Sequence, residues 1–135
     1  GVPQNRERVF IIGHLRGTPR PKVFPFGARN TDDDKKRGIV QINKPNHAGY
    51  RLYGTGGVSP NLRARDRGDE HSSPRIDDGV RIRRLTPTEC ERLQGFPNGW
   101  TEGISDTQRY KCLGNAVTVN VVREVVKNLL YEQRA

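Results

Sequence analysis

Apolar and polar positions divide the chain into three zones. Near the start, the apolar run Val9 to Ile12 is rich in β-branched and aromatic residues, which predicts a buried strand ended by Gly13. Near the end, apolar residues recur at helical spacing with charged residues opposite, which predicts a long amphipathic helix. These positions are Val117, Val121, Val122, Val125, Val126, Leu129 and Leu130. One strand is not a fold by itself, so both elements require a partner surface.

A capping signal predicts a shorter helix before the long one. Thr86 is followed by Pro87 and by Glu89, which is the pattern of a capping box with proline at the first helical position. Gly95 is expected to end this helix. Glu89 and Arg92 stand one turn apart on this helix, a spacing that allows them to pair.

A second capping signal lies between these two helices. Ser105 with Gln108 predicts another capping box, and Gly114 is expected to end that turn of helix. Gly114 and Asn115 would then form a tight turn at the start of the long helix, where backbone N–H groups can receive a polar ligand. An ordinary turn at a helix start is the open alternative.

The middle zone, about residues 16–81, is rich in Gly, Pro, Asn, Asp and Arg. Strand-like pieces occur at GIVQI and YRLYG. This composition predicts an irregular region dominated by loops and short strands, with most of the charge on its surface.

The net charge of the chain indicates which class of partner it binds. The 135 residues include 24 Lys and Arg against 15 Asp and Glu, a net charge of +9 with a pI of about 10.2. A strongly positive field favours a polyanion such as nucleic acid, although a merely soluble basic protein fits too.

Cys90 and Cys112 form no metal-binding pattern and are interpreted as small buried residues, so no metal is expected. Without a membrane-length apolar run or signal sequence, a cytoplasmic location is expected.

The segment PQNRER carries a second candidate site. On a strand, Arg6 and Arg8 project from one face and Gln4 joins them at the strand's entrance. Two guanidiniums and an amide suit phosphate oxygens or a base edge. A solvated strand face is the alternative.

Taken together and in order, three segments resemble the C-terminal part of the DNA (cytosine-5)-methyltransferases. They are GVPQNRERVFIIG, RRLTPTECERLQGFP and YKCLGNAVTVNVV. Between the first and second, that family carries its target-recognition domain, and the basic middle zone occupies this place. The resemblance implies that duplex DNA is the partner and S-adenosylmethionine the methyl donor. It also implies a flipped cytosine attacked by a cysteine thiolate, as in restriction-modification enzymes.

The resemblance assigns roles to individual residues. Arg8 matches an arginine that reaches the flipped cytosine, and Gln4 and Arg6 match its neighbours in the catalytic shell. Candidate cofactor-binding residues are Asn115, Ala116 and Val117. Candidate DNA-binding residues are Arg51, Asn61, Leu62, Arg63 and Arg65, followed by Arg67. Asn61 stands where the family has threonine, so the role of that position differs.

The family nucleophile lies in a Pro-Cys-Gln segment, which this sequence does not contain. We therefore expect the chain to act as the C-terminal fragment or smaller subunit of a methyltransferase, inactive without the N-terminal half or larger subunit that carries this cysteine. That half would supply the sheet and the partner for the apolar helix face. A non-enzymatic DNA-binding module is the alternative, and a small RNA-binding protein is a weaker one.

The expected fold class is α/β: the C-terminal portion of a Rossmann-like, S-adenosylmethionine-dependent methyltransferase fold with a small, irregular, β-rich target-recognition domain. Residues 1–15 are assigned to a catalytic-domain strand region, 16–81 to target recognition and 82–135 to the closing catalytic helices.

Overall fold

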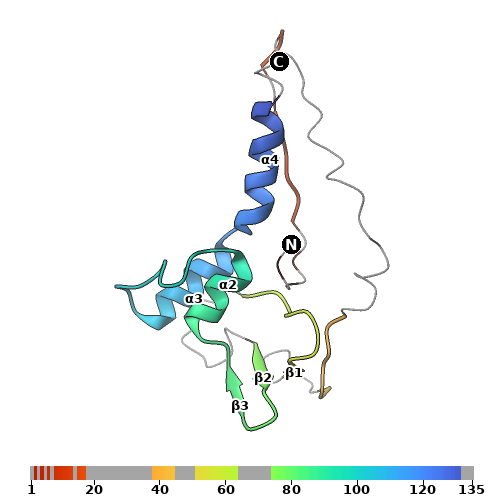
Figure 1. Cartoon of the computed structure of the whole chain (residues 1–135), viewed down its shortest axis with the longest axis vertical. Helices are drawn as coiled ribbons and strands as arrows, with labels where there is room; N and C mark the ends of the chain where they lie inside the picture. Colours follow the sequence, from red (N-terminus) through yellow and green to blue (C-terminus); the bar gives the residue numbers. More distant parts are fainter. Residues whose placement is uncertain are drawn as a thin grey trace.

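The computed structural model describes residues 2, 4, 6, 8–13, 15–17, 38–44, 51–63 and 74–131. A small sheet in the order β1-β2-β3 lies at one end of the molecule (Figure 1). Its strands are β1 (Leu52–Gly54), β2 (Arg75–Asp77) and β3 (Ile82–Arg84). The helices α2 (Pro87–Gln94) and α3 (Asp106–Asn115) lie next to it, and α4 (Val119–Tyr131) extends away on the far side. The fold is mixed α/β, as the sequence predicts.

The two strand-like pieces of the middle zone do lie together. Gln41 forms an antiparallel bridge with Tyr53 of β1. Flanking backbone bonds run from Ile42 N to the Leu52 carbonyl at 2.8 Å and from Gly54 N to the Val40 carbonyl at 2.9 Å. The structure therefore pairs these two strand-like pieces, which the sequence pattern did not predict.

A tight hairpin joins β2 and β3 across the predicted boundary at residue 81. Asp77 Oδ1 accepts from Gly79 N at 2.9 Å, and Asp78 Oδ1 accepts from Arg81 N at 2.9 Å. Gly79 has φ of 84°, which suits glycine because it has no Cβ. The carboxylates of this turn thus satisfy backbone N–H groups of the turn itself.

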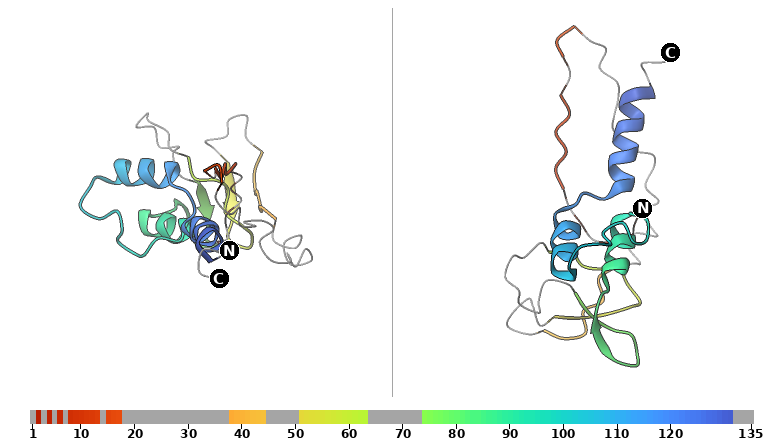
Figure 2. Two further views of the ribbon diagram at one scale, coloured as in Figure 1. Left: turned by 90° about the horizontal axis from the view of Figure 1, so that it is seen from above. Right: turned by 90° about the vertical axis from the view of Figure 1, so that its left-hand side faces the viewer.

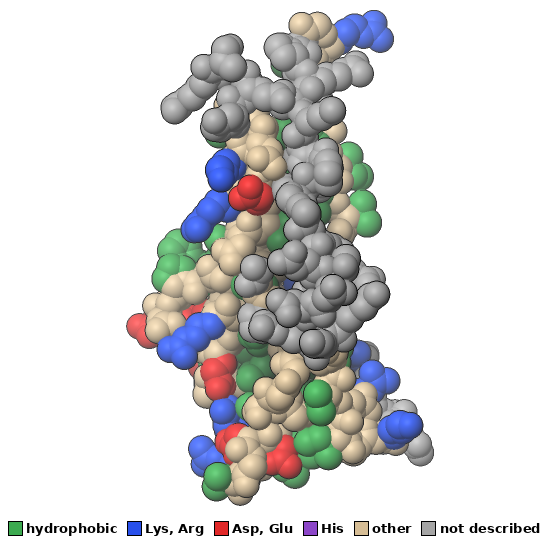
Figure 3. Space-filling model, turned by 45° about the vertical axis from the view of Figure 1, so that its right-hand side comes forward, with side chains coloured by type: hydrophobic (Ala, Val, Ile, Leu, Met, Phe, Trp, Pro, Cys, Tyr) green, Lys and Arg blue, Asp and Glu red, His purple; other side chains and the backbone are tan. Residues whose placement is uncertain are grey.

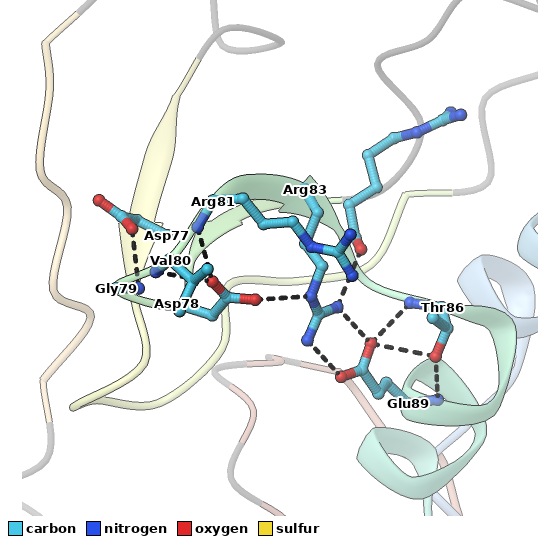
Figure 4. Close-up of polar contacts among 9 residues, drawn as sticks. Asp77, Asp78, Gly79, Val80, Arg81, Arg83, Thr86 and Glu89 are labelled. Atoms are coloured by element: carbon cyan, nitrogen blue, oxygen red, sulfur yellow. Dashed lines mark hydrogen bonds and ion pairs between the residues drawn. The ribbon is translucent and has the colours of Figure 1, made fainter.

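Helix α2 begins and ends as predicted. The Thr86 hydroxyl accepts from Glu89 N, Glu89 accepts from Thr86 N at 2.7 Å, and Gly95 closes the helix with φ of 80°. Glu89, however, pairs with Arg83 of β3 and not with Arg92, through two bonds of 2.9 Å (Figure 4). Arg92 instead donates to Asn98. The two terminal nitrogens of Arg83 donate to the two carboxylate oxygens of Glu89, and such a bidentate pair is stronger than a single hydrogen bond.

Arg83 links the hairpin to the helix, because Asp78 accepts from its Nε at 3.1 Å (Figure 4). The bonds from Arg83 are the main cause that lowers the pKa of Glu89 to about 2, and further bonds come from Thr86. Glu89 is therefore a carboxylate at neutral pH and is fully engaged.

Helix α3 differs from its prediction at its C-terminal end. Ser105 caps it, accepting from Gln108 N at 3.5 Å, but the helix continues through Gly114 to Asn115. Ala116 N still donates to the Cys112 carbonyl at 2.9 Å, and α4 begins only at Val119. Gly114 is buried inside the last turn, where a small residue permits close packing, so the predicted turn at 114–115 is wrong.

The core lies between the sheet and the α2–α3 pair. It contains Leu62, Leu85, Cys90 and Leu113, with Ile76, Leu93, Phe96 and Tyr110 packed around them. The hydroxyl of Tyr110 donates to the Leu85 carbonyl at 2.7 Å, which satisfies the one polar group of that ring. Burial is thus concentrated in the second half of the chain.

A buried carboxylate holds the segment between α2 and α3. Glu91 is 0% exposed and accepts from Gly99 N at 2.7 Å, Thr101 N at 2.9 Å and Thr101 Oγ1 at 2.5 Å. Arg109 adds a bond of 3.2 Å. Burial raises the pKa of Glu91, but bonds from Thr101, Gly99 and Arg109 outweigh it and lower the value to about 2. The charge of Glu91 therefore organises this loop from within.

Two predicted apolar elements remain largely uncovered. Residues 8–13 run as an extended chain with no strand pairing to other described residues, and Val9 and Ile11 are 89% and 94% exposed (Figure 2). The predicted buried strand is therefore wrong for this chain, because the described residues offer no neighbouring strand. On α4, Val125 is buried while Val126 and Leu130 are exposed. None of the described helices is long and apolar enough to cross a membrane.

We expect Glu91→Ala to lower the free energy of unfolding by about 3 kcal/mol, because it leaves buried donors and a partly buried arginine without their acceptor. Urea unfolding of the full chain at pH 7 measures this change. Glu102→Ala removes an exposed carboxylate from the same loop and is expected to cost less than about 0.5 kcal/mol. Equal losses in both variants would contradict this account of Glu91.

Acid should remove the stabilisation that Glu89 and Glu91 provide. Both have folded pKa values of about 2, lowered from 4.5. Their contribution is therefore complete above about pH 4.5 and is lost as the pH falls towards 2. Unfolding curves at steps from pH 6 to pH 3 should show a smaller loss of stability in Glu91→Gln than in the wild type, and parallel curves would contradict the prediction.

Candidate functional site

Three distant segments meet at the guanidinium of Arg6. One terminal nitrogen donates to Asn61 Oδ1 at 2.6 Å and to the Leu62 carbonyl at 3.4 Å. The other donates to the carbonyls of Gly114 and Ala116 at 2.9 and 2.5 Å. The planar guanidinium group has several N–H donors, so it can donate to acceptors on two sides at once. Arg6 thus joins the N-terminal segment, the middle zone and the passage from α3 to α4.

The surroundings of Arg6 contain polar atoms with no partner among the described residues. Burial, and then the charge of Arg8, lower the pKa of Arg6. Its Nε and both amide atoms of Gln4 are buried without a hydrogen-bond partner in that part of the chain. Gln4 is held by a parallel bridge with Ser59. Buried polar groups normally have partners, so this amide is suited to receive a group from outside the described residues.

Arg8 is exposed, unlike Arg6. The structure therefore separates two arginines that the strand pattern places together, since Arg6 is partly buried and Arg8 is exposed.

The passage between α3 and α4 contains the three predicted cofactor-binding residues. The Asn115 side chain is exposed, and Val117 is 39% exposed. Ala116 is extended, with φ of −59° and ψ of 153°, and its carbonyl accepts from Arg6. The passage therefore offers an exposed amide and an exposed apolar side chain on a backbone that Arg6 restrains.

Sequence reasoning missed Gln94, which restrains the same passage from its other side. Gln94 is 0% exposed, and its Nε2 donates to the Leu113 carbonyl at 2.9 Å. Its Oε1 accepts from Thr118 Oγ1 at 3.3 Å, and Thr118 is 6% exposed. In the sequence this residue looks like any polar residue near a helix end, and no local signal distinguishes it.

The predicted DNA-binding residues divide into buried and exposed ones. Leu62 is 4% exposed and belongs to the core, so it supports the loop from within. Asn61 is exposed and accepts from Arg6. Arg51 and Arg63 are exposed, and Arg65 and Arg67 lie outside the described residues. Basic side chains appear on both sides of the sheet end of the molecule (Figure 3).

The two cysteines differ from each other. Cys90 is 0% exposed, and burial raises the pKa of its thiol to about 12, so it is not a thiolate at neutral pH. Cys112 is exposed, and its predicted burial is wrong because α3 turns Leu113, not Cys112, towards the core. Among the described residues, no group of His, Cys, Asp and Glu could hold a metal ion.

Comparison with known proteins identifies the family. The family model described as C-5 cytosine-specific DNA methylase matches residues 35–131, well over half of the chain. The Type II methyltransferase M.SsoII of Shigella sonnei is 30% identical over 156 residues, covering 96% of this chain and 41% of the relative.

Two further relatives show how the similarity is distributed. The Type II methyltransferase M.NlaX of Neisseria lactamica is 29% identical, with 96% of this chain and 48% of the relative covered. The Type II methyltransferase M.BanI of Aneurinibacillus aneurinilyticus is 53% identical over 61 residues, which is 45% of this chain. The chain thus spans less than half the length of M.NlaX and M.SsoII.

The bond between Arg6 and Asn61 should be measurable as a coupling. We expect Arg6→Lys and Asn61→Ala each to lower the free energy of unfolding, and the double variant to lose about 0.5–1 kcal/mol less than the sum. Urea unfolding of the four full-length proteins gives this value. The pair Arg6→Lys and Arg63→Ala serves as the control and should be additive. Additivity in both cycles would contradict a direct Arg6–Asn61 interaction.

Proposed function

Because the chain belongs to the C-5 cytosine-specific DNA methylase family, we propose that it takes part in transfer of a methyl group from S-adenosylmethionine to the 5-position of cytosine in duplex DNA. The observation that carries this proposal is the convergence on Arg6. The N-terminal segment, the middle zone and the α3–α4 passage are brought together by four hydrogen bonds. A recognition region linked to the α3–α4 passage in this way suits an enzyme that must coordinate DNA contact with chemistry.

In this proposal, residues 16–81 recognise the target, and residues 1–15 and 82–135 belong to a Rossmann-like catalytic domain. Arg8 is exposed, and in this proposal it would polarise the flipped cytosine by donating hydrogen bonds to it. The buried, unpartnered amide of Gln4 would bind a neighbouring group of the complete site. Arg6 would act as a positioning residue, since both of its terminal nitrogens already donate within the chain.

The side chains of the α3–α4 passage suit S-adenosylmethionine, which has both polar and apolar groups. Asn115 offers an exposed amide for polar groups and Val117 an exposed apolar surface, while the backbone at Ala116 is restrained by Arg6. The bound cofactor would supply an electrophilic methyl group. The chain's own part is to line one side of that site and to keep its shape.

The thiolate nucleophile would come from a segment that this sequence does not contain. Cys90 is buried and protonated, and Cys112 lies on α3 outside any Pro-Cys-Gln segment. The exposed apolar side chains of residues 8–13 and of α4 would pack against the part that carries the nucleophile. We propose that the chain works in the cytoplasm as the smaller part of such an enzyme.

A second candidate is a DNA-binding module without catalysis. The net charge of +9 and the absence of a Pro-Cys-Gln segment favour it. Binding of this kind would depend steeply on salt and weakly on sequence. A methyl-transfer assay separates the two candidates.

We expect labelled methyl to pass from S-adenosylmethionine to duplex DNA when the chain is mixed with the polypeptide encoded immediately upstream, and not with either alone. Arg8→Ala in the mixture should lower the rate about 100-fold, because a donor to the reacting base is lost. Arg16→Ala removes an exposed arginine near the same segment and should leave the rate within about twofold. Transfer by the chain alone, or no effect of Arg8→Ala, would contradict the proposal.

A further inference from the structure

One buried amide reaches both ends of the α3–α4 passage. Gln94 is the last residue of α2 and is 0% exposed. Its Nε2 donates to the Leu113 carbonyl at 2.9 Å, and its Oε1 accepts from Thr118 Oγ1 at 3.3 Å. Leu113 and Thr118 enclose the candidate cofactor-binding residues, 115–117. A single side chain therefore holds the chain both before and after that segment.

The two contacts together require an amide side chain at position 94. The Leu113 carbonyl lies near the end of α3, where carbonyls no longer find a donor within their own helix. A carbonyl can only accept, so residue 94 must offer an N–H. The Thr118 hydroxyl donates, so the same side chain must also offer an acceptor. Ionised glutamate has no donor and methionine has no N–H, although both are close to glutamine in length.

Thr118 extends this restraint to α4. It directly precedes α4, and its carbonyl accepts from Val122 N at 3.3 Å in the first turn of that helix. The end of α2 lies close to the same turn, because a Cβ at Gly95 would be only 3.3 Å from Asn120 Oδ1. Helix α4 leaves the α2–α3 pair at this point (Figure 1). The contacts of Gln94 therefore influence the direction in which the chain leaves the passage.

Arg6 and Gln94 hold different groups of the passage. Arg6 donates to the carbonyls of Gly114 and Ala116, and neither of these is a contact of Gln94. One restraint therefore does not replace the other. Gln94 is also fully buried, so its own side chain does not reach a ligand. Any effect of Gln94 on a ligand must act through the backbone that it holds.

We infer that Gln94 is a positioning residue for S-adenosylmethionine. Without its amide, the Leu113 carbonyl and the Thr118 hydroxyl lose their buried partners, and the passage is no longer held in one conformation. A preformed site binds its ligand more tightly than a site that must be ordered on binding. The inference rests on the proposed function for the identity of the ligand. It adds to that site a buried residue that acts from a different helix.

The test is the affinity of the reconstituted mixture for S-adenosylmethionine, measured by equilibrium dialysis of the labelled compound without DNA. We expect Gln94→Met to raise the Kd about tenfold, the change that corresponds to the loss of one buried hydrogen bond. The Kd for a labelled DNA duplex should stay within about twofold, because the passage is not part of the recognition region.

Thr118 provides the matched variants. Thr118→Val removes the hydroxyl and should raise the Kd for S-adenosylmethionine about threefold, whereas Thr118→Ser keeps the hydroxyl and should stay within about twofold of the wild type. Adding Thr118→Val to Gln94→Met should change little, since the hydroxyl has already lost its acceptor. Should Gln94→Met fail to fold, the comparison of Thr118→Val with Thr118→Ser decides the question. Equal Kd values in those two variants would overturn the inference.

A control separates positioning from general destabilisation. Glu91→Gln weakens a buried contact of the same helix, but this contact holds the α2–α3 loop and not the passage. It should lower the urea midpoint and leave the Kd for S-adenosylmethionine within about twofold. An equal rise of the Kd in Glu91→Gln and Gln94→Met would overturn the inference. An unchanged Kd in a folded Gln94→Met would overturn it as well.

Methyl transfer distinguishes a failure of this inference from a failure of the proposed function. If the wild-type mixture binds S-adenosylmethionine and Gln94→Met weakens this binding, but no methyl reaches duplex DNA, the proposed function is rejected and the positioning role stands. Methyl transfer by the wild type with an unchanged Kd in Gln94→Met rejects the role of Gln94 alone. No binding of S-adenosylmethionine by the wild-type mixture would overturn both.

Discussion

The hydrogen bonds of Arg6 are the constraint on which the arrangement of the site depends. Arg6 lies more than fifty residues from Asn61 and more than a hundred from Ala116, yet one guanidinium contacts both. A parallel bridge between Gln4 and Ser59 also holds the N-terminal segment to the middle zone. Arginine suits this role because it stays charged even where burial lowers its pKa.

The helical part of the molecule is held together by buried polar groups as well as by apolar ones. Glu91 and Gln94 are one helical turn apart on α2, and both are fully buried. Glu91 binds the loop that follows α2, and Gln94 binds the passage that follows α3. Buried backbone N–H and C=O groups need hydrogen-bond partners. The side chains of Glu91 and Gln94 provide partners for the backbone groups of these two segments. The helical unit therefore presents the α3–α4 passage in a defined conformation.

Some apolar side chains outside the core are exposed to solvent. Val9 and Ile11 on the extended segment and Val126 and Leu130 on α4 are exposed although they follow strand and helix patterns. The hydrophobic effect favours covering such surfaces. Other exposed apolar side chains, such as Ile42, Ile82 and Trp100, lie elsewhere on the chain. This distribution agrees with a chain that spans less than half the length of its relatives M.NlaX and M.SsoII.

The sequence by itself determined the family and the capped helix α2, because these depend on local patterns and ordered motifs, whereas the pairing of the GIVQI and YRLYG segments was decided by the tertiary structure. Only the tertiary structure decided that Glu89 pairs with Arg83 and that Leu62 is buried while Asn61 binds Arg6. The end of α3 and the exposure of Cys112 were also decided by packing. The physical reason is that hydrogen-bond partners and burial depend on which distant segments meet, and local spacing does not encode those meetings.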